Sequence, residues 1–253
     1  MPCTLPTDIL YGPVFSRRLG RSLGINLFRA EGKVCSFDCV YCECGRTIAH
    51  TLTPTRDDVY PTDVVLAAVE RAFSKPRTIQ ALTLSGNGEP TLHPDFLSVI
   101  EGIRSMITAL RPEVKLALFT NGSRSSNPRI QSAYRLIDQV MIKLDSGDEE
   151  TFKKINRPIG GFAFSDLIDG FRQTPRYIIQ GCMINGNITN VSGEAYSAWF
   201  DRLGALQPEA VHLYSIDRSP WNQSVQVVSP EKLKQIERDI RERLCFEVRT
   251  FWR

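Results

Sequence analysis

The loop Cys35-Ser36-Phe37-Asp38-Cys39-Val40-Tyr41-Cys42 carries three thiols in the spacing C-x3-C-x2-C. Such short spacings allow one loop to direct all of its sulfurs onto a single centre. Thiolates are soft ligands that select zinc or iron–sulfur clusters. A four-iron cluster usually takes four cysteines, so a complete set of three leaves one iron open to another ligand. The loop therefore predicts a metal centre with an open position, where chemistry occurs.

Zinc is the alternative to a cluster at these thiols. A structural zinc ion takes four ligands, and Cys44 or His50 would supply the fourth. The three-thiol spacing, with no histidine inside it, favours an iron–sulfur cluster. A disulfide framework does not fit, because seven cysteines is an odd count and a chain of 253 residues needs no covalent staples.

The composition is that of an ordinary globular chain. It has 253 residues, 42% of them hydrophobic, which is enough to bury a sizeable core in one or two domains. No apolar run reaches the roughly 18 residues of a membrane span, and residues 1–6 do not resemble a secretory signal. We therefore expect a cytoplasmic protein without membrane contact. A net charge of +3 neither requires nor excludes a nucleic-acid partner.

Apolar runs typical of buried strands alternate with segments of helical spacing along the chain. Strands are predicted at 23–28, 79–84, 114–119, 139–145, 177–184, 210–216 and, as an edge strand, 246–251. Helices are predicted at 57–74, with Thr62 as N-cap, and at 96–110, 128–136, 147–155, 164–171, 195–206 and 230–244. The alternation indicates a parallel α/β sheet with helical crossovers. About six βα units are too few for the closed eight-stranded barrel, so we expect an incomplete one.

We expect one domain over residues 1–253, with a basic N-terminal loop at 1–22 and an edge-strand extension at 245–253. Arg17, Arg18 and Arg21 cluster in that loop. A guanidinium presents a planar fork of donors to carboxylates and phosphates, so these residues are candidates for a substrate clamp. Ordinary surface charge is the alternative.

Unusual residues gather where the predicted strands end, which is where parallel α/β folds place their functional sites. Each of these groups also has an ordinary interpretation: a tight turn for the glycines, a mutual salt bridge for the Lys–Asp pair, and core packing for the histidine. The candidates are Gly86, Gly88, Glu89, Thr120, Asn121, Lys143, Asp145, Gln180, His212 and Tyr214, and a following loop adds Asp217 and Arg218.

Five segments carry a resemblance to a known family: residues 11–24, 35–42, 86–94, 120–122 and 143–145. C-x3-C-x2-C with an aromatic residue, Tyr41, before the third cysteine resembles the signature of the radical S-adenosylmethionine (SAM) superfamily. Together the segments are similar to a compact subgroup that is grouped with wyosine-type tRNA-modifying proteins. Wyosine synthases carry further N-terminal cysteines, where this sequence has only Cys3.

The resemblance implies a partial (β/α)6 barrel of the radical SAM type, with a [4Fe–4S] cluster on Cys35, Cys39 and Cys42. SAM would chelate the fourth iron, and its reductive cleavage would give methionine and a 5′-deoxyadenosyl radical that abstracts hydrogen from a substrate. The glycines and Glu89 would hold the SAM amino group, Lys143 its carboxylate and Asp145 its ribose. The other candidate SAM-lining residues are Tyr41, Thr120, Asn121, Gln180, His212 and Tyr214.

The substrate is left open by the sequence. A small molecule or a tRNA nucleoside is the first hypothesis, and a protein or peptide, as for an activator of a glycyl-radical partner, is the second. A non-catalytic zinc-binding module is the third. The first two imply an electron donor of the flavodoxin or ferredoxin type. Four further cysteines lack compact spacing, so we expect buried thiols rather than an auxiliary cluster at Cys3, Cys44, Cys182 and Cys245.

Overall fold

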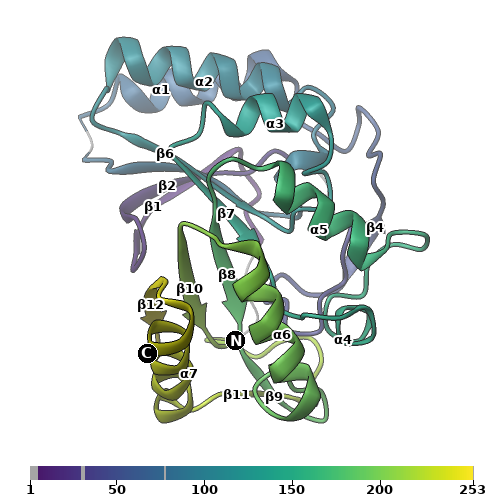
Figure 1. The fold of residues 1–253 in the computed structure, drawn as a ribbon. Helices are drawn as coiled ribbons and strands as arrows, with labels where there is room; N and C mark the ends of the chain where they lie inside the picture. Colours follow the sequence, from purple (N-terminus) through teal and green to yellow (C-terminus); the bar gives the residue numbers. More distant parts are fainter. Residues whose placement is uncertain (1–4, 30–31, 77, 253) are drawn as a thin grey trace.

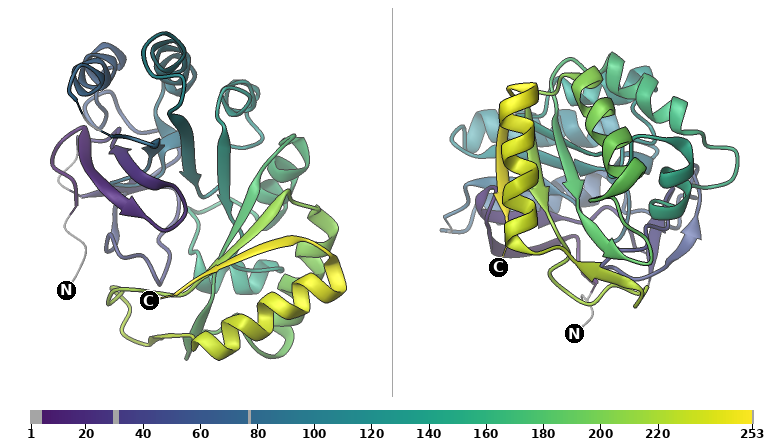
Figure 2. Two further views of the ribbon diagram at one scale, coloured as in Figure 1. Left: turned by 90° about the vertical axis from the view of Figure 1, so that its left-hand side faces the viewer. Right: turned by 60° about the horizontal axis from the view of Figure 1, so that its bottom comes forward.

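The computed structural model describes residues 5–29, 32–76 and 78–252. Eight strands form one curved sheet whose helices lie on its outer side (Figure 1, Figure 2). The strand order is β1 (Leu10–Ser16), β2 (Gly20–Ile25), β5 (Ala81–Leu84), β6 (Lys115–Thr120), β7 (Gln139–Lys143), β8 (Ile178–Cys182), β10 (Ala210–Tyr214) and β12 (Glu247–Phe251). β1 runs antiparallel to β2, and every other neighbouring pair in this sheet is parallel.

A helix follows each of the six strands β2, β5, β6, β7, β8 and β10 before the chain returns to the sheet. The predicted partial (β/α)6 barrel is therefore confirmed, with β12 as the predicted edge strand. The helices are α1 (Thr62–Phe73), α2 (Phe96–Leu110), α3 (Pro128–Tyr134), α4 (Glu149–Ile155), α5 (Phe164–Gln173), α6 (Gly193–Leu206) and α7 (Pro230–Leu244), with a 3-10 turn η1 (Pro90–Leu92).

The prediction of a basic loop before the first strand is wrong for residues 10–22. This segment forms β1 and the start of β2, an antiparallel hairpin at the edge of the sheet, with a register irregularity between Tyr11 and Val14. Val14 and Phe15 are exposed on it. An edge strand with one partner and two exposed apolar residues has no buried run to reveal it, and Gly12-Pro13 breaks the alternation that a strand pattern needs.

Two element boundaries also differ from prediction. β2 ends at Ile25 rather than at 28, because the Asn26 side chain both accepts from the Phe28 amide and donates to the Phe28 carbonyl, which turns the chain. Helix α1 begins at Thr62 itself, after Pro61, and no side-chain hydrogen bond caps it. Thr62 is therefore the first helical residue and not the N-cap.

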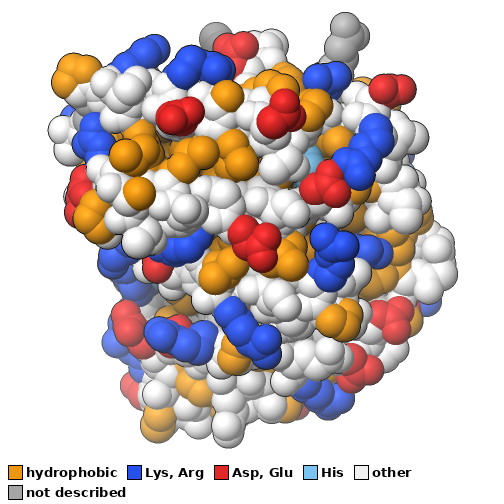
Figure 3. All heavy atoms as spheres, turned by 90° about the horizontal axis from the view of Figure 1, so that it is seen from above, with side chains coloured by type: hydrophobic (Ala, Val, Ile, Leu, Met, Phe, Trp, Pro, Cys, Tyr) orange, Lys and Arg blue, Asp and Glu red, His pale blue; other side chains and the backbone are white. Residues whose placement is uncertain are grey.

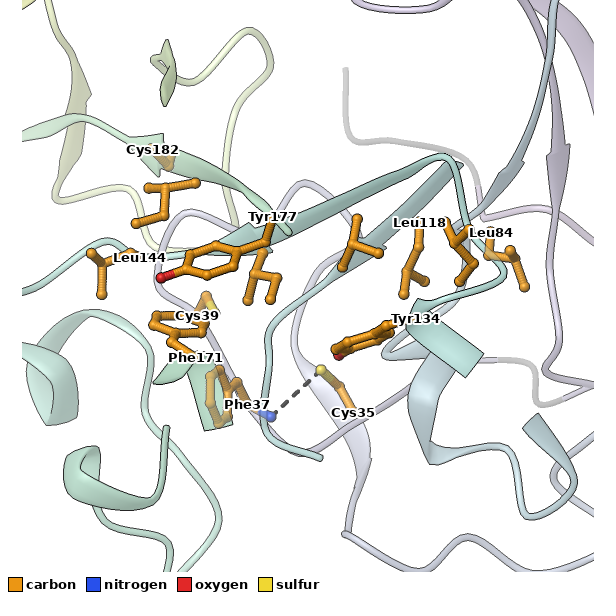
Figure 4. Close-up of a cluster of buried hydrophobic side chains, with 14 of the residues drawn as sticks. Cys35, Phe37, Cys39, Leu84, Leu118, Tyr134, Leu144, Phe171, Tyr177 and Cys182 are labelled. Carbon is orange, nitrogen blue, oxygen red and sulfur yellow. Dashed lines mark hydrogen bonds between the residues drawn. The ribbon is translucent and has the colours of Figure 1, made fainter. Parts of the chain in front are cut away.

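The core packs between the sheet and its helices, and the cysteine loop belongs to it. β5 is buried along its whole length, and Figure 4 shows Cys35 and Cys39 beside apolar side chains that include Leu118 and Leu144. On the face seen in Figure 3, acidic and basic side chains are interspersed, with apolar ones between them. Within the part of the chain that the structure describes, no helix is both long and apolar enough to traverse a bilayer.

Candidate active site

A cavity of about 440 Å³ opens where the cysteine loop faces the carboxyl ends of the sheet strands. Cys35, Cys39 and Cys42 all line it. The strand ends bring to the same cavity twelve further residues that the sequence singled out: Arg17, Arg18, Tyr41, Gly86, Gly88, Glu89, Thr120, Asn121, Lys143, Gln180, Tyr214 and Asp217. Residues far apart in sequence thus meet because parallel strands end at one edge of the sheet.

The cysteine loop is anchored on one side to the glycine turn after β5. Strand β3 (Lys33–Cys35) pairs with β4 (Thr47–His50), and the Val34 amide donates to the Asn87 carbonyl at 2.8 Å. Gly88 has φ +146°, and a Cβ there would lie 1.7 Å from the Val34 carbonyl oxygen. Only glycine allows the two backbones to approach this closely.

The other side of the loop is held by the end of helix α4. The Val40 amide donates to the Ile155 carbonyl at 2.9 Å, and the Asp38 amide donates to the Asn156 carbonyl at 3.1 Å. The Trp221 indole, from the loop after β10, donates to the Cys39 carbonyl at 2.9 Å. The glycine turn after β5, the end of α4 and the loop after β10 therefore fix the backbone that carries the thiols.

Amide groups point at two of the thiols. Asn121 Nδ2 and the Phe37 backbone amide each lie 3.5 Å from Cys35 Sγ (Figure 4 shows the latter contact). Asn156 Nδ2 lies 3.5 Å from Cys39 Sγ and also donates to Asp145 Oδ2 at 2.8 Å. Hydrogen bonds of this kind to cysteine sulfur stabilise thiolate ligands and influence the potential of an iron–sulfur cluster.

The three thiols differ in acidity. Burial raises the pKa of Cys35 to about 12, and burial also raises that of Cys39. A hydrogen bond with Cys44, together with the Lys33 ammonium, lowers the pKa of Cys42 to about 6 against the effect of burial. Because thiolates are the metal ligands, metal uptake releases protons from Cys35 and Cys39.

Glu89 is buried at the cavity wall and is held by four protein donors. Its Oε1 accepts from the Thr91 amide, the Thr91 hydroxyl and the Thr120 hydroxyl at 3.0, 2.6 and 2.7 Å. Its Oε2 accepts from the Asn121 amide at 2.6 Å. Burial raises the pKa of Glu89, and these hydrogen bonds oppose that rise. Oε2 is the oxygen that retains acceptor capacity toward the cavity.

Lys143 and Asp145 form the mutual ion pair that was the ordinary interpretation of this motif. Lys143 Nζ lies 3.0 Å from Asp145 Oδ1 and donates to the Tyr214 hydroxyl at 2.5 Å. Burial on its own would lower the pKa of Lys143, but the charges of Asp145, Tyr214 and Cys182 and the hydrogen bond to Tyr214 together raise it. Lys143 lines the cavity, and its positive charge is already paired with the Asp145 carboxylate.

Asp145 does not line the cavity, although the resemblance implied a contact with the SAM ribose. Its carboxylate is fully buried and accepts hydrogen bonds from the Tyr41 hydroxyl, Asn156 Nδ2 and the Cys182 amide in addition to the ion pair. β7 ends at Lys143, so the alternation that would place both side chains on one face no longer applies two residues later. The structure places this carboxylate behind the wall, where it joins the cysteine loop to β8.

The N-terminal hairpin and the loop after β10 meet at the mouth of the cavity. Arg17 forms an ion pair with Asp217. The Arg18 guanidinium lies 4.6 Å from the ring centroids of both Tyr214 and Phe251, and its buried Nε has no hydrogen-bond partner within residues 5–29, 32–76 and 78–252. Arg18 therefore lines the cavity and retains a donor, Nε, without a partner among the described residues.

Besides Asp145, three predicted site residues lie outside the cavity. Arg21 is exposed on β2, where its backbone amide donates to Gln80. His212 packs edge-on against Phe251 of the neighbouring strand β12, with ring centroids 5.2 Å apart. Arg218 lies 3.7 Å from Glu43 and lines a neighbouring cavity of about 510 Å³.

Several cavity residues were not predicted as part of the SAM or substrate site. Lys33 and Cys44 were detectable, since both are within two positions of a motif thiol, whereas the indole contact of Trp221 left no local signal. The additional lining residues are Lys33, Glu43, Cys44, Ser85, Phe119, Cys182, Ser215 and Ile216.

The four other cysteines behave differently from one another. Cys182 is buried, as expected, while Cys245 is exposed at the end of α7, and Cys3 lies outside the described residues. Cys44 Sγ contacts the Gly86 carbonyl at 3.7 Å, and His50 Nε2 is engaged by the Ser36 carbonyl at 2.9 Å. Over the described ranges, no group of three or more His, Cys, Asp or Glu side chains is arranged to hold a single metal ion.

Residues 32–196 match the sequence profile of the radical SAM superfamily. This range contains the cysteine loop and the ends of β5 to β8, and the chain belongs to the radical SAM superfamily. It is 29% identical to a UPF0026 protein of Helicobacter pylori (strain J99), over 89% of this chain and 72% of that one. It is 32% identical to the UPF0026 protein MJ1312 of Methanocaldococcus jannaschii, over 90% of this chain and 68% of that one.

Solved structures share the fold. A radical SAM methyltransferase from Sphaerobacter thermophilus superimposes with a TM-score of 0.64 at 16% identity, over 91% of this chain and 65% of that one. The structure of TYW1 with a lysine-pyruvate adduct bound gives a TM-score of 0.64 at 12% identity, over 90% of this chain and 75% of that one. The chain is thus a radical SAM enzyme with the partial-barrel fold, and its superfamily implies a [4Fe–4S] cluster and SAM.

Proposed function

We propose that Cys35, Cys39 and Cys42 hold a [4Fe–4S] cluster and that the 440 Å³ cavity beside them binds SAM and part of a substrate. The observation that carries the proposal is the meeting of three thiols with the ends of five parallel strands in one cavity. The donor set fits the group, because three soft sulfurs with nearby amide donors suit an iron–sulfur cluster. When bound, the cluster and SAM supply reductive cleavage of SAM, which yields methionine and the 5′-deoxyadenosyl radical that abstracts hydrogen from the substrate.

The chain's own residues position SAM in this proposal. Glu89 Oε2 accepts from the SAM amino group, since Oε1 is already saturated by protein donors. Lys143, fixed by Asp145 and Tyr214, presents its ammonium to the SAM carboxylate. Asp145 acts through Lys143 and Tyr41 rather than on the ribose. Thr120, Asn121 and Gln180 complete the wall.

The mouth of the cavity restricts water and selects the substrate. The Arg17–Asp217 ion pair and the contacts of Glu43 with the backbone amides of Asp217 and Arg218 bring the loop after β10 over the opening. Arg18, whose Nε is unpartnered, is positioned to bind a phosphate or carboxylate of the substrate. The proposed substrate is accordingly an anionic small molecule or a nucleoside in tRNA, with an electron donor of the flavodoxin or ferredoxin type. A single domain over residues 1–253, in the cytoplasm, is part of this proposal.

Anaerobic reconstitution tests the proposal. We expect about four irons and four sulfides per chain, a brown colour, and release of 5′-deoxyadenosine when dithionite and SAM are added. Cys42→Ala should lose both iron and SAM cleavage, whereas the exposed thiol variant Cys245→Ser should keep both.

Two results would contradict the proposal or redirect it. Zinc as the sole bound metal, with no SAM cleavage, would support the non-catalytic zinc module instead. Capture of a partner protein rather than tRNA or a small anion by the reconstituted enzyme would support the glycyl-radical activator or peptide modifier.

A further inference from the structure

Lys33 is a buried cation at the cysteine loop that the proposed SAM site does not use. It lies on β3 two residues before Cys35, so alternation directs both side chains to the same face. Its exposed fraction is 4%, and it lines the cavity that contains the three thiols. Nζ is buried, no oxygen or nitrogen of the described part of the chain accepts from it, and the Cys42 sulfur is the neighbour in hydrogen-bonding position.

A buried ammonium without a carboxylate partner is costly, so a site that retains one is expected to supply another anion in the working state. The nearby carboxylates do not serve this purpose. Glu89 is held by four donors from its own neighbourhood, and Glu43 and Asp217 face Arg218 and Arg17. Asp145, behind the cavity wall, is paired with Lys143 at 3.0 Å. The groups whose charges act on Lys33 are Cys35, Cys42 and Cys39, that is, all three sulfurs of the loop.

We propose that Lys33 is a positioning residue for the cluster: its ammonium donates an N–H···S hydrogen bond to a cluster or cysteine sulfur and raises the cluster's midpoint potential. This inference rests on the proposed function, because it requires a cluster on these cysteines. Three thiolates and an oxidised [4Fe–4S] core carry one net negative charge. Reduction by one electron from a low-potential donor of the ferredoxin class raises the net negative charge to two. No proton is taken up and no bond is broken in this step. A fixed positive charge therefore stabilises the reduced form more than the oxidised form.

The test is a redox titration of the reconstituted protein without SAM, poised with dithionite and followed by the electron paramagnetic resonance signal of the reduced cluster. Lys33→Met keeps the length and removes the charge, while Lys33→Arg keeps the charge. Lys75→Met removes the same charge from the exposed far end of α1. This readout is independent of SAM cleavage.

We expect Lys33→Met to lower the ratio of reduced to oxidised cluster at least tenfold at a fixed potential, a downward shift of about 59 mV for a one-electron couple. Lys33→Arg should remain within about threefold of the unmodified protein, and Lys75→Met should not shift. Loss of the cluster from both Lys33→Met and Lys33→Gln, with native circular dichroism and four irons retained by Lys33→Arg, would also support the assignment, since only the charge separates these variants.

An unchanged potential in Lys33→Met would overturn the inference. If the potential is unchanged and the dissociation constant for SAM rises instead, Lys33 serves the SAM carboxylate and not the cluster. The proposed function fails separately, because its failure would appear as an unmodified protein that binds no four-iron cluster at all.

Discussion

The buried ion pair behind the cavity makes the sharpest stability prediction. Asp145→Asn removes the charge that compensates Lys143 and keeps the size of the side chain. Two unit charges 3.0 Å apart interact by about 5 kcal/mol at an effective dielectric constant near 20. Asparagine retains one acceptor oxygen for Lys143 and the Cys182 amide, but its amide group opposes the donor of Asn156. We therefore expect a loss of about 3 kcal/mol, as for other buried pairs broken on one side.

Urea unfolding of the metal-free protein at pH 7, followed by circular dichroism, measures this loss. The matched control is Asp169→Asn, whose partner Arg172 is exposed on helix α5 and whose loss should be below about 0.5 kcal/mol. The double variant Lys143→Met/Asp145→Asn should lose less than the sum of its two single changes, since no ammonium is left unpaired. If Asp145→Asn lowers the free energy of unfolding by less than about 1 kcal/mol, with the same dependence on urea concentration, the reasoning is refuted.

Two further predictions concern His212 and the glycine turn. Burial, assisted by the charges of Arg18 and Arg249, lowers the pKa of His212 from 6.5 to about 4. The unfolded chain therefore binds more protons between these pH values, and His212 makes stability fall as the pH drops through that window. His212→Phe should reduce this dependence by up to about 3 kcal/mol in urea titrations, and parallel curves would contradict it. Gly88→Ala, whose Cβ would lie 1.7 Å from a backbone oxygen, should destabilise the apo fold by more than about 3 kcal/mol. Gly160→Ala, with open space around it, should change the melting temperature little. Equal shifts in melting temperature for Gly88→Ala and Gly160→Ala would contradict the steric argument.

The parts of the fold that could be predicted are those with local signals. The run Ala81–Leu84 is apolar apart from Thr83, and a strand buried on both faces needs such a run, so β5 was predicted. The short spacing of Cys35, Cys39 and Cys42 places the three thiols on one loop, independently of the fold of the rest of the chain. The strand-end positions of Gly88 and Lys143 followed from the order of the elements, because parallel strands end at one edge.

The parts that could not be predicted depend on partners distant in sequence. β1 has no buried run, and its place in the sheet comes from its pairing with β2, which itself pairs with β5. His212 has the same alternation as Tyr214, but β12 covers it with Phe251.

The sequence by itself determined the thiol loop, the six repeated units and the edge at which their functional residues gather, because spacing and periodicity are properties of neighbouring residues. Only the tertiary structure decided where the charges went. It turned Asp145 behind the cavity wall to hold Lys143, and left the ammonium of Lys33 beside three sulfurs. Two buried charges pair when packing brings them within about 3–4 Å of each other. That distance depends on residues far apart in the chain, so a sequence pattern cannot predict it.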